Sequence, residues 1–217
     1  QIWKLIIIWT RFLIMNKKFR IAGIIAALIA SAVILTSPSV PPPIPEPLQN
    51  NTRNQFIEVL ATDLEKPWSI DFADNRIFIS EKTGTIRVFD SEKLLEDPLV
   101  TLRTADVFDG GLLGITSHPD FIQNHILYAY YTYNEEGELW NKVIQIKEFN
   151  NKITEAKTIL DKIPGSSFSN GGIIKFGPDL KLYIGTGVVS DLTHESQNLE
   201  SLEGKILRLN DDGSVPD

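Results

Sequence analysis

The chain has 217 residues, enough for one domain with a hydrophobic core and an additional segment. Hydrophobic residues make up 42% and charged residues 23%, and the formal net charge of −7 argues against nucleic acid as a partner, because neutralising phosphates requires clustered Lys and Arg. The chain has no cysteine, so disulfides, thiolate metal sites, a cysteine nucleophile and a lipoprotein anchor are excluded.

The amino-terminal part of the chain has the pattern of an export signal. Residues 1–14 precede Met15, the only methionine, and we interpret them as an upstream extension. After Met15 come a short basic region and a predominantly apolar run over residues 21–35, which has the length of a signal-peptide core and is short for a membrane span. Residues 15–37 are therefore predicted to be a signal peptide or a membrane anchor. We expect an exported protein, extracellular or membrane-anchored facing outside, that contacts a membrane only through this segment.

A proline-rich stretch separates this segment from the rest of the chain. Residues 38–55 include Pro41-Pro42-Pro43, a composition that favours an extended, solvated spacer. We predict a linker there and a globular domain over residues 56–217.

Short strand candidates recur in the globular part, in three groups with turns between them. They are Ser69–Phe72, Arg76–Ser80 and Thr85–Phe89; Leu113–Ile115, Ile126–Tyr133 and Lys142–Phe149; and Ile173–Phe176, Leu182–Ile184 and Lys205–Leu209. The groups are spaced by about 45–60 residues, the scale of a propeller blade of four short strands. One turn of helix is expected at Leu199–Leu202. The predicted fold class is all-β, a partial β-propeller of about three blades.

Three motifs follow one another in this part of the chain. The first is Glu65-Lys66-Pro67-Trp68-Ser69-Ile70, followed by Glu81 and Gly84; the second is Asp109-Gly110-Gly111-Leu112-Leu113-Gly114, followed by His118-Pro119-Asp120-Phe121; the third runs from Phe168 to Gly187 and continues at Ser201–Leu209. Each is weak alone, but in this order they resemble the PQQ-dependent soluble aldose sugar dehydrogenases, the glucose/sorbosone dehydrogenase family. The resemblance covers most of residues 56–217.

The resemblance implies a six-bladed propeller of the quinoprotein glucose dehydrogenase type, of which this chain would be the amino-terminal half. A half propeller leaves two open edges and an exposed central face, so we expect a partner that completes the ring. The resemblance also implies oxidation of an aldose sugar at its anomeric carbon to a lactone, with hydride transfer to PQQ.

The catalytic pair of the family is replaced in this chain. By alignment, the family's histidine, which takes the proton of the sugar hydroxyl, falls on Ser169, and the acidic residue that orients it falls on Val188. An unassisted serine hydroxyl is a poor base near neutral pH, and valine cannot accept a hydrogen bond. We therefore expect this chain to be inactive on its own.

Four further residues are candidates for cofactor binding by the same resemblance: Asp109, Gly110, Asn170 and Gly171. For each of them, a role in a tight turn is the alternative. PQQ carries three carboxylates, and in relatives the Lys and Arg residues that hold it, and the calcium site, lie in later blades. No metal site is predicted in this chain, and we expect weak PQQ binding by the chain alone.

Two other hypotheses stay open on the sequence. The chain also resembles non-catalytic propellers of the hedgehog-interacting type, which would make it an extracellular module that binds carbohydrate or protein. A six-bladed lactonase would use acidic calcium ligands near the propeller axis, and that pattern is not visible in the sequence.

Overall fold

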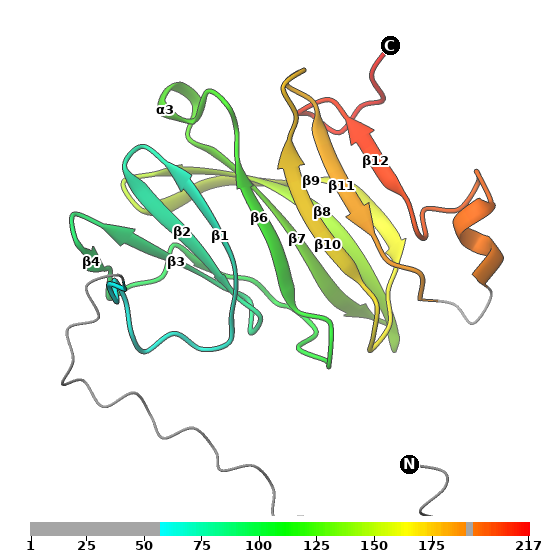
Figure 1. The fold of residues 1–217 in the computed structure, drawn as a ribbon, viewed down its shortest axis with the longest axis horizontal. Helices are drawn as coiled ribbons and strands as arrows, with labels where there is room; N and C mark the ends of the chain where they lie inside the picture. Colours follow the sequence, from blue (N-terminus) through cyan, green and yellow to red (C-terminus); the bar gives the residue numbers. More distant parts are fainter. Residues whose placement is uncertain (1–56, 190–192) are drawn as a thin grey trace, which may run out of the picture. The chain divides into compact units, whose positions relative to one another are not determined.

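The computed structural model describes residues 57–189 and 193–217, which are coloured in Figure 1. The extension, the signal peptide or anchor, and the linker predicted for residues 1–14, 15–37 and 38–55 lie outside the described residues. Within the described ranges, no helix has the length and apolar character needed to cross a membrane.

Blade 1 is a five-stranded antiparallel sheet. Its strands are β1 (Pro67–Ala73), β2 (Arg76–Glu81), β3 (Thr85–Asp90), β4 (Lys93–Leu94) and β5 (Val100–Thr101), and both β4 and β5 pair with β3. Asp74 and Asn75 connect β1 to β2 with positive φ angles of 50° and 58°, the geometry of a two-residue hairpin turn that Asp and Asn tolerate. Alternate positions of β3, Ile86 and Val88, are fully buried, as the two-residue period of a strand requires.

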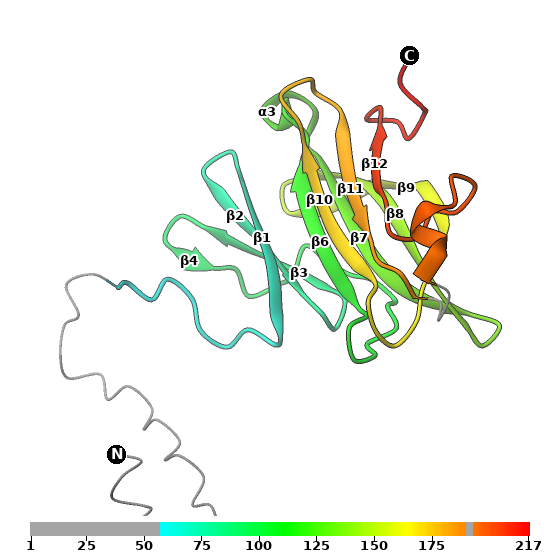
Figure 2. The same ribbon diagram turned by 45° about the vertical axis from the view of Figure 1, so that its right-hand side comes forward.

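Blade 2 is a four-stranded antiparallel sheet and lies between the other two blades (Figures 1 and 2). Its strands are β6 (Leu112–Ser117), β7 (Ile126–Glu135), β8 (Glu138–Phe149) and β9 (Lys152–Pro164), with a one-turn helix, α3 (Phe121–Asn124), between β6 and β7. Blade 3 has three strands, β10 (Gly171–Phe176), β11 (Leu182–Thr186) and β12 (Ile206–Leu209), and a short 3-10 helix, η1 (Thr193–Gln197), connects the last two.

The first strands of the blades, β1, β6 and β10, lie side by side, with β6 in contact with both of the others (Figures 1 and 2). They begin at Pro67, Leu112 and Gly171, a spacing within the predicted range. Three stacked sheets that share a row of first strands are the arrangement of a propeller sector. The prediction of an all-β partial propeller with about three blades is therefore confirmed.

Two hydrophobic clusters fill the spaces between the blades. One lies between blades 1 and 2 and includes Phe78 and Leu127; the other lies between blades 2 and 3 and includes Tyr130 and Ile174. Strand β7 contributes to both, because successive side chains of a strand point to opposite faces. This explains why β7 is an almost continuous apolar and aromatic run in the sequence.

Two sequence predictions differ from the structure. Strand β9 was not predicted, because most of its 13 residues are exposed or half-buried and carry no apolar alternation. The helical turn expected at Leu199–Leu202 is wrong: the helical turn lies earlier, at η1, and Leu199 is almost fully exposed. A lone exposed leucine is therefore not evidence of a helix face here.

Candidate functional site

The shared direction of β1, β6 and β10 defines two sides of this part of the protein. We call the side where these strands begin the start side; it carries the loops of residues 64–66, 105–111 and 165–170. We call the side where they end the far side, and the residues at these ends line one cavity there. All six predicted site residues belong to segments of the start side, or to the chain directly after β11.

Asp109 and Ser169 are brought together on the start side. The Asp109 carboxylate accepts a hydrogen bond from the backbone N–H of Ser169 at 3.2 Å, and the backbone N–H of Asp109 donates to the carbonyl of Ser167 at 2.9 Å. Ser169 has φ of 58°, an uncommon conformation for a serine, and its side chain is exposed. The two residues are 60 positions apart in sequence, so the fold, not local sequence, creates this contact.

Val188 lies close to the same point. Gly187, directly before it, packs so tightly on Ser169 that an added Cβ would stand 1.6 Å from the Ser169 carbonyl oxygen. The Val188 side chain itself faces Gly204, where an added Cβ would lie 2.6 Å from Cγ2 of Val188. The chain that follows β11 therefore meets the Ser169 loop, with the apolar side chain of Val188 turned toward a neighbouring turn. The assignment of position 188 to the acidic residue of the family stays a prediction.

Asn170 is held inside the loop that contains Ser169. Its amide oxygen accepts from the backbone N–H of Ser166 at 3.0 Å and from the side-chain amide of Asn141 at 3.1 Å, and its amide nitrogen donates to the carbonyl of Ser166 at 2.8 Å. Asn170 is only 1% exposed, and its own carbonyl accepts from the Tyr130 hydroxyl at 2.9 Å. These contacts show that Asn170 stabilises the turn, which was the alternative to cofactor binding. A role of Asn170 in binding a cofactor stays a prediction.

Gly110 and Gly171 permit close contact between protein segments. An added Cβ on Gly110 would lie 2.6 Å from Val107, and one on Gly171, where φ is 74°, would lie 2.6 Å from the backbone nitrogen of Gly187. Both glycines are thus explained by packing within the protein. Whether they also approach a cofactor stays a prediction.

The sequence analysis missed four residues that build the surface of the start side. Lys82 is only 8% exposed; its ammonium donates to the Phe108 carbonyl and lies 4.9 Å from the ring centroid of Trp68. Phe108 and Phe168 stack with ring centroids 4.9 Å apart and an interplanar angle of 18°. Trp68, Phe108 and Phe168 are all more than half exposed. The available signal was two phenylalanines, each directly preceding a predicted site residue.

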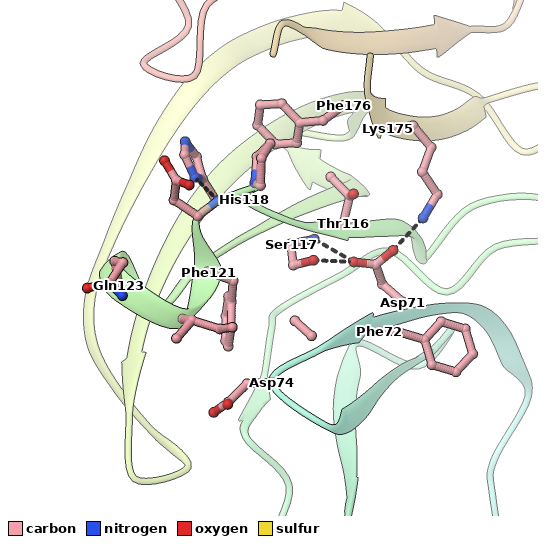
Figure 3. Close-up of a pocket in the computed structure, with 14 residues that line it drawn as sticks. Asp71, Phe72, Asp74, Thr116, Ser117, His118, Phe121, Gln123, Lys175 and Phe176 are labelled. Carbon is pink, nitrogen blue, oxygen red and sulfur yellow. Dashed lines mark hydrogen bonds and ion pairs between the residues drawn. The ribbon is translucent and has the colours of Figure 1, made fainter. Parts of the chain in front are cut away.

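The far side has a cavity of about 510 Å³ with a different character (Figure 3). At its centre, the Asp71 carboxylate accepts from the backbone N–H of Ser117 at 2.7 Å, from the Ser117 hydroxyl at 2.6 Å and from the Lys175 ammonium at 2.5 Å. Figure 3 shows these three side chains converging from β1, β6 and β10. One residue from each first strand thus joins the three blades across the axis.

His118 lines this cavity, and its contacts with neighbouring protein groups explain its position. Its Nδ1 accepts from the backbone N–H of Asp120 at 2.9 Å, its ring packs edge-on against Phe176 with centroids 5.4 Å apart, and its Nε2 lies 3.5 Å from an Asp211 carboxylate oxygen. Across the part of the chain that the structure describes, no group of three or more His, Cys, Asp or Glu side chains is placed to hold a metal ion.

Two buried tyrosines connect blade 2 to blade 3, one toward each side. The Tyr130 hydroxyl bonds the Asn170 carbonyl, and the Tyr128 hydroxyl bonds the Asp211 carbonyl at 3.0 Å. Burial raises the pKa of Tyr128 to about 12, against a smaller opposing effect of its hydrogen bond from Gln145, and burial also raises the pKa of Tyr130. Both hydroxyls therefore stay protonated donors over the physiological range.

Known proteins with a similar sequence and fold identify the family of this chain. The Glucose / Sorbosone dehydrogenase family matches residues 64–217, and the chain belongs to that family. The aldose sugar dehydrogenase YliI of Escherichia coli (strain K12) is 30% identical over 171 residues, covering 74% of this chain and 45% of the relative; the quinoprotein glucose dehydrogenase B of Acinetobacter calcoaceticus is 29% identical, covering 73% and 40%. The PQQ-bound form of the aldose sugar dehydrogenase from Streptomyces coelicolor superposes with a TM-score of 0.66 at 32% identity, covering 72% of this chain and 48% of that chain. The chain thus spans about half the length of the relatives it matches.

The start side does not by itself fit PQQ. Three carboxylates call for cationic partners. The Lys66 ammonium is paired with Asp106 at 2.6 Å, and the Lys82 ammonium is buried between the Phe108 carbonyl and the Trp68 ring. Asp106 neutralises the charge of Lys66, whose side chain is 54% exposed, and Lys82 is nearly buried and directed to protein groups. A bound tricarboxylate would have to compete with these contacts.

Proposed function

We propose that residues 57–217 form three blades of a PQQ-dependent aldose sugar dehydrogenase and that this chain on its own does not turn over. The observation that carries the proposal is the convergence of Asp109, Ser169 and the Gly187–Val188 segment on the start side, within the part that matches the family. The proposed substrate is an aldose, oxidised at its anomeric carbon to a lactone, and the proposed cofactor is PQQ.

The proposal of inactivity rests on two side chains. Ser169 stands where the family has a histidine base, and no described residue makes a hydrogen bond to its hydroxyl that would activate it. Val188 stands where the family has the acid that orients the histidine, and its side chain packs on Gly204. Because neither residue can accept the proton of the sugar hydroxyl, the positions of the family's catalytic pair supply no general base. In relatives, cationic side chains and calcium hold PQQ, and we propose that here these groups come from outside this chain. A partner that completes the ring would supply them.

A second candidate function is an extracellular module that binds carbohydrate or protein without catalysis. The observation that favours it is the exposed aromatic surface of Trp68, Phe108 and Phe168. Exposed aromatic side chains of this kind are enriched in binding surfaces. The export expected from residues 15–37 is part of both proposals, because both act on ligands outside the cell.

The proposed function is tested by restoring the catalytic pair. Aldose-dependent dye reduction is measured at saturating PQQ and calcium for the wild type, for Ser169→His and for Ser169→His/Val188→Asp, each purified from source cells together with the partner proposed to complete the ring. We expect turnover by the double variant to be at least about 10²-fold faster than by the wild type, since a general base typically contributes about 10²–10⁴ in rate. Ser91→His is the matched control, because Ser91 is also an exposed serine with positive φ, at 49°.

Wild-type turnover at the rate of the Escherichia coli relative would contradict the assignment of inactivity. Turnover by neither variant in a complex that binds PQQ would contradict the assignment of positions 169 and 188. Micromolar PQQ binding by the wild-type chain, measured by calorimetry, would overturn the conclusion that its lysines do not fit the cofactor.

A further inference from the structure

Lys82 follows directly after β2 and contacts the loop of residues 105–111 and its neighbours at several points. Its backbone N–H donates to the carbonyl of Lys66 at 3.1 Å, and its backbone carbonyl accepts from Leu112, the first residue of β6, at 3.0 Å. Its side chain crosses the same loop and donates to the Phe108 carbonyl. Lys82 therefore fixes both the start of the first strand of blade 2 and the loop before it.

The environment of the Lys82 ammonium makes this contact sensitive to displacement. The residue is 8% exposed, and burying an ammonium is costly unless hydrogen bonds or charges replace its hydration. In the described part of the chain, no carboxylate forms an ion pair with Lys82; its partners are the Phe108 carbonyl and the face of Trp68. Moving the loop would leave the ammonium buried without an acceptor, so the ammonium and the loop hold each other in place.

The loop transmits this constraint to the position of the missing base. Phe108 stacks on Phe168, and Asp109, the next residue, receives the backbone N–H of Ser169. Asp109 also donates its own N–H to Ser167. Two successive residues of the loop that Lys82 holds therefore set the position of two successive residues, Phe168 and Ser169.

We propose that Lys82 is a positioning residue of the start-side site, which fixes residue 169 through Phe108 and Asp109. The inference rests on the proposed function only in treating the start side as the ligand site. The contact itself is a property of the fold. Lys82 would act without touching the reacting atoms, and its effect would reach the site only through the loop of residues 105–111.

The test compares Lys82→Met, which keeps most of the side-chain volume without the charge, with Lys82→Arg, which keeps the charge and the donors. Lys142→Met is the control, because the Lys142 ammonium also lies over an aromatic ring, Tyr133 at 3.9 Å, but on blade 2. The readouts are amide hydrogen exchange at Ser169 and Asp109, and exchange at Val143 and Ile146 of β8 as a distant reference. A third readout is Trp68 fluorescence in a background in which the other three tryptophans, Trp3, Trp9 and Trp140, are changed to Phe.

We expect Lys82→Met to speed exchange at Ser169 and Asp109 by about tenfold, the effect of losing one hydrogen bond to a charged group, with β8 unchanged. Its Trp68 emission should shift, because the cation over the ring is lost. Lys82→Arg should restore both, and Lys142→Met should leave both as in the wild type.

Unchanged exchange at Ser169 in Lys82→Met would overturn the proposal, and so would an equal rise at Ser169 and in β8, which would indicate a general loss of stability. These outcomes do not depend on catalysis. A positive exchange result combined with no turnover by Ser169→His/Val188→Asp in a complex that binds PQQ would leave Lys82 as the positioning residue and reject the assignment of positions 169 and 188.

Discussion

The two sides of the first strands are held together in different ways. On the far side, charged and hydroxyl side chains join β1, β6 and β10 directly, through Asp71, Ser117 and Lys175. On the start side, the joining groups are mostly main-chain N–H and carbonyl groups within loops, reached by side chains such as Asp109 and Asn170. On the far side, side chains thus connect the strands to one another, whereas on the start side they connect loops through the main chain.

This difference separates the residues that hold the blades together from those that shape the candidate site. Strand ends are already ordered by their sheets, so a side-chain network there adds rigidity between blades. Loops have no ladder to satisfy their backbone, so they need side chains that bond the main chain, and functional residues can then vary above that framework. The following predictions test whether stability and site geometry can be changed separately.

The largest effect is expected from Asn170→Ala on the start side. The change removes three hydrogen bonds: the Ser166 backbone loses two, and the buried Asn141 amide loses one and keeps its bond to the Pro164 carbonyl. We expect the free energy of unfolding, measured with urea, to fall by about 3 kcal/mol. Asn134→Ala is the control: Asn134 is exposed at the end of β7 and accepts one hydrogen bond, from the Gly137 N–H, so its loss should cost about 1 kcal/mol or less. Equal effects of the two changes would show that Asn170 does not organise its loop.

The next effect is expected from Asp71→Asn on the far side. The amide keeps the shape of the carboxylate but weakens the bonds from the Ser117 hydroxyl and the Lys175 ammonium. We expect a loss of about 2 kcal/mol in unfolding free energy, with amide exchange at Ser169 unchanged. Asp97→Asn at an exposed position is the control. Faster exchange at Ser169 would mean that the two sides are coupled and not separable.

The two buried tyrosines allow both sides to be compared within one strand. Tyr128→Phe removes the bond to the Asp211 carbonyl and Tyr130→Phe the bond to the Asn170 carbonyl, each at a cost of about 1 kcal/mol. Only Tyr130→Phe should alter exchange in the loop of residues 165–170. If Tyr128→Phe altered that loop equally, the division of the two hydroxyls between the sides would be wrong.

The same tyrosines predict a loss of stability in alkali. The pKa of Tyr128 is raised from 10 to about 12 in the folded state, so from pH 10 to pH 12 the unfolded state binds fewer protons than the folded state. The contribution of the protonated Tyr128 to the free energy of unfolding is therefore complete below pH 10 and falls as the pH rises toward 12. Tyr128→Phe should flatten this decline in urea unfolding curves. An unchanged decline in the variant would rule out Tyr128 as its source.

The smallest effect is expected from Lys175→Met. The Lys175 side chain is 54% exposed, and exposed ion pairs contribute little because water and salt screen them. We expect the free energy of unfolding to change by less than about 0.5 kcal/mol. The same change is expected for the wild type in about 0.5 M salt, where the screening length is about 4 Å. A loss comparable to that of Asp71→Asn would show that Lys175, not the Ser117 contacts, carries the network.

The strands were predictable wherever burial imposes a pattern. Tyr128, Tyr130 and their neighbours in β7 are buried from both sides, and their continuous apolar run identified the strand. Strand β9 has no such constraint, since it lies at the edge of its sheet and most of its side chains meet solvent, so its polar composition concealed it.

The site was predictable by position but not by environment. The motifs placed Asp109 and Ser169 in one site, and the structure brings them into contact. The direction of the Asn170 amide could not be inferred, because its partner Asn141 comes from a strand of blade 2 that lies 29 positions earlier in the sequence. The same holds for Lys82, because its contacts with Phe108 and Trp68 join segments that are far apart in the sequence.

The bonds that shape the Ser169 loop have an evolutionary consequence. Asp109 binds the backbone N–H of residue 169 and Tyr130 binds the backbone carbonyl of residue 170, so neither contact depends on which side chain occupies position 169. These two bonds therefore do not select the side chain at position 169, which is restricted only by the positive φ of the residue and by selection on catalysis. A gene released from catalytic selection can replace the residue in one step and still encode the same loop, and a later substitution can return a base to a framework that never changed.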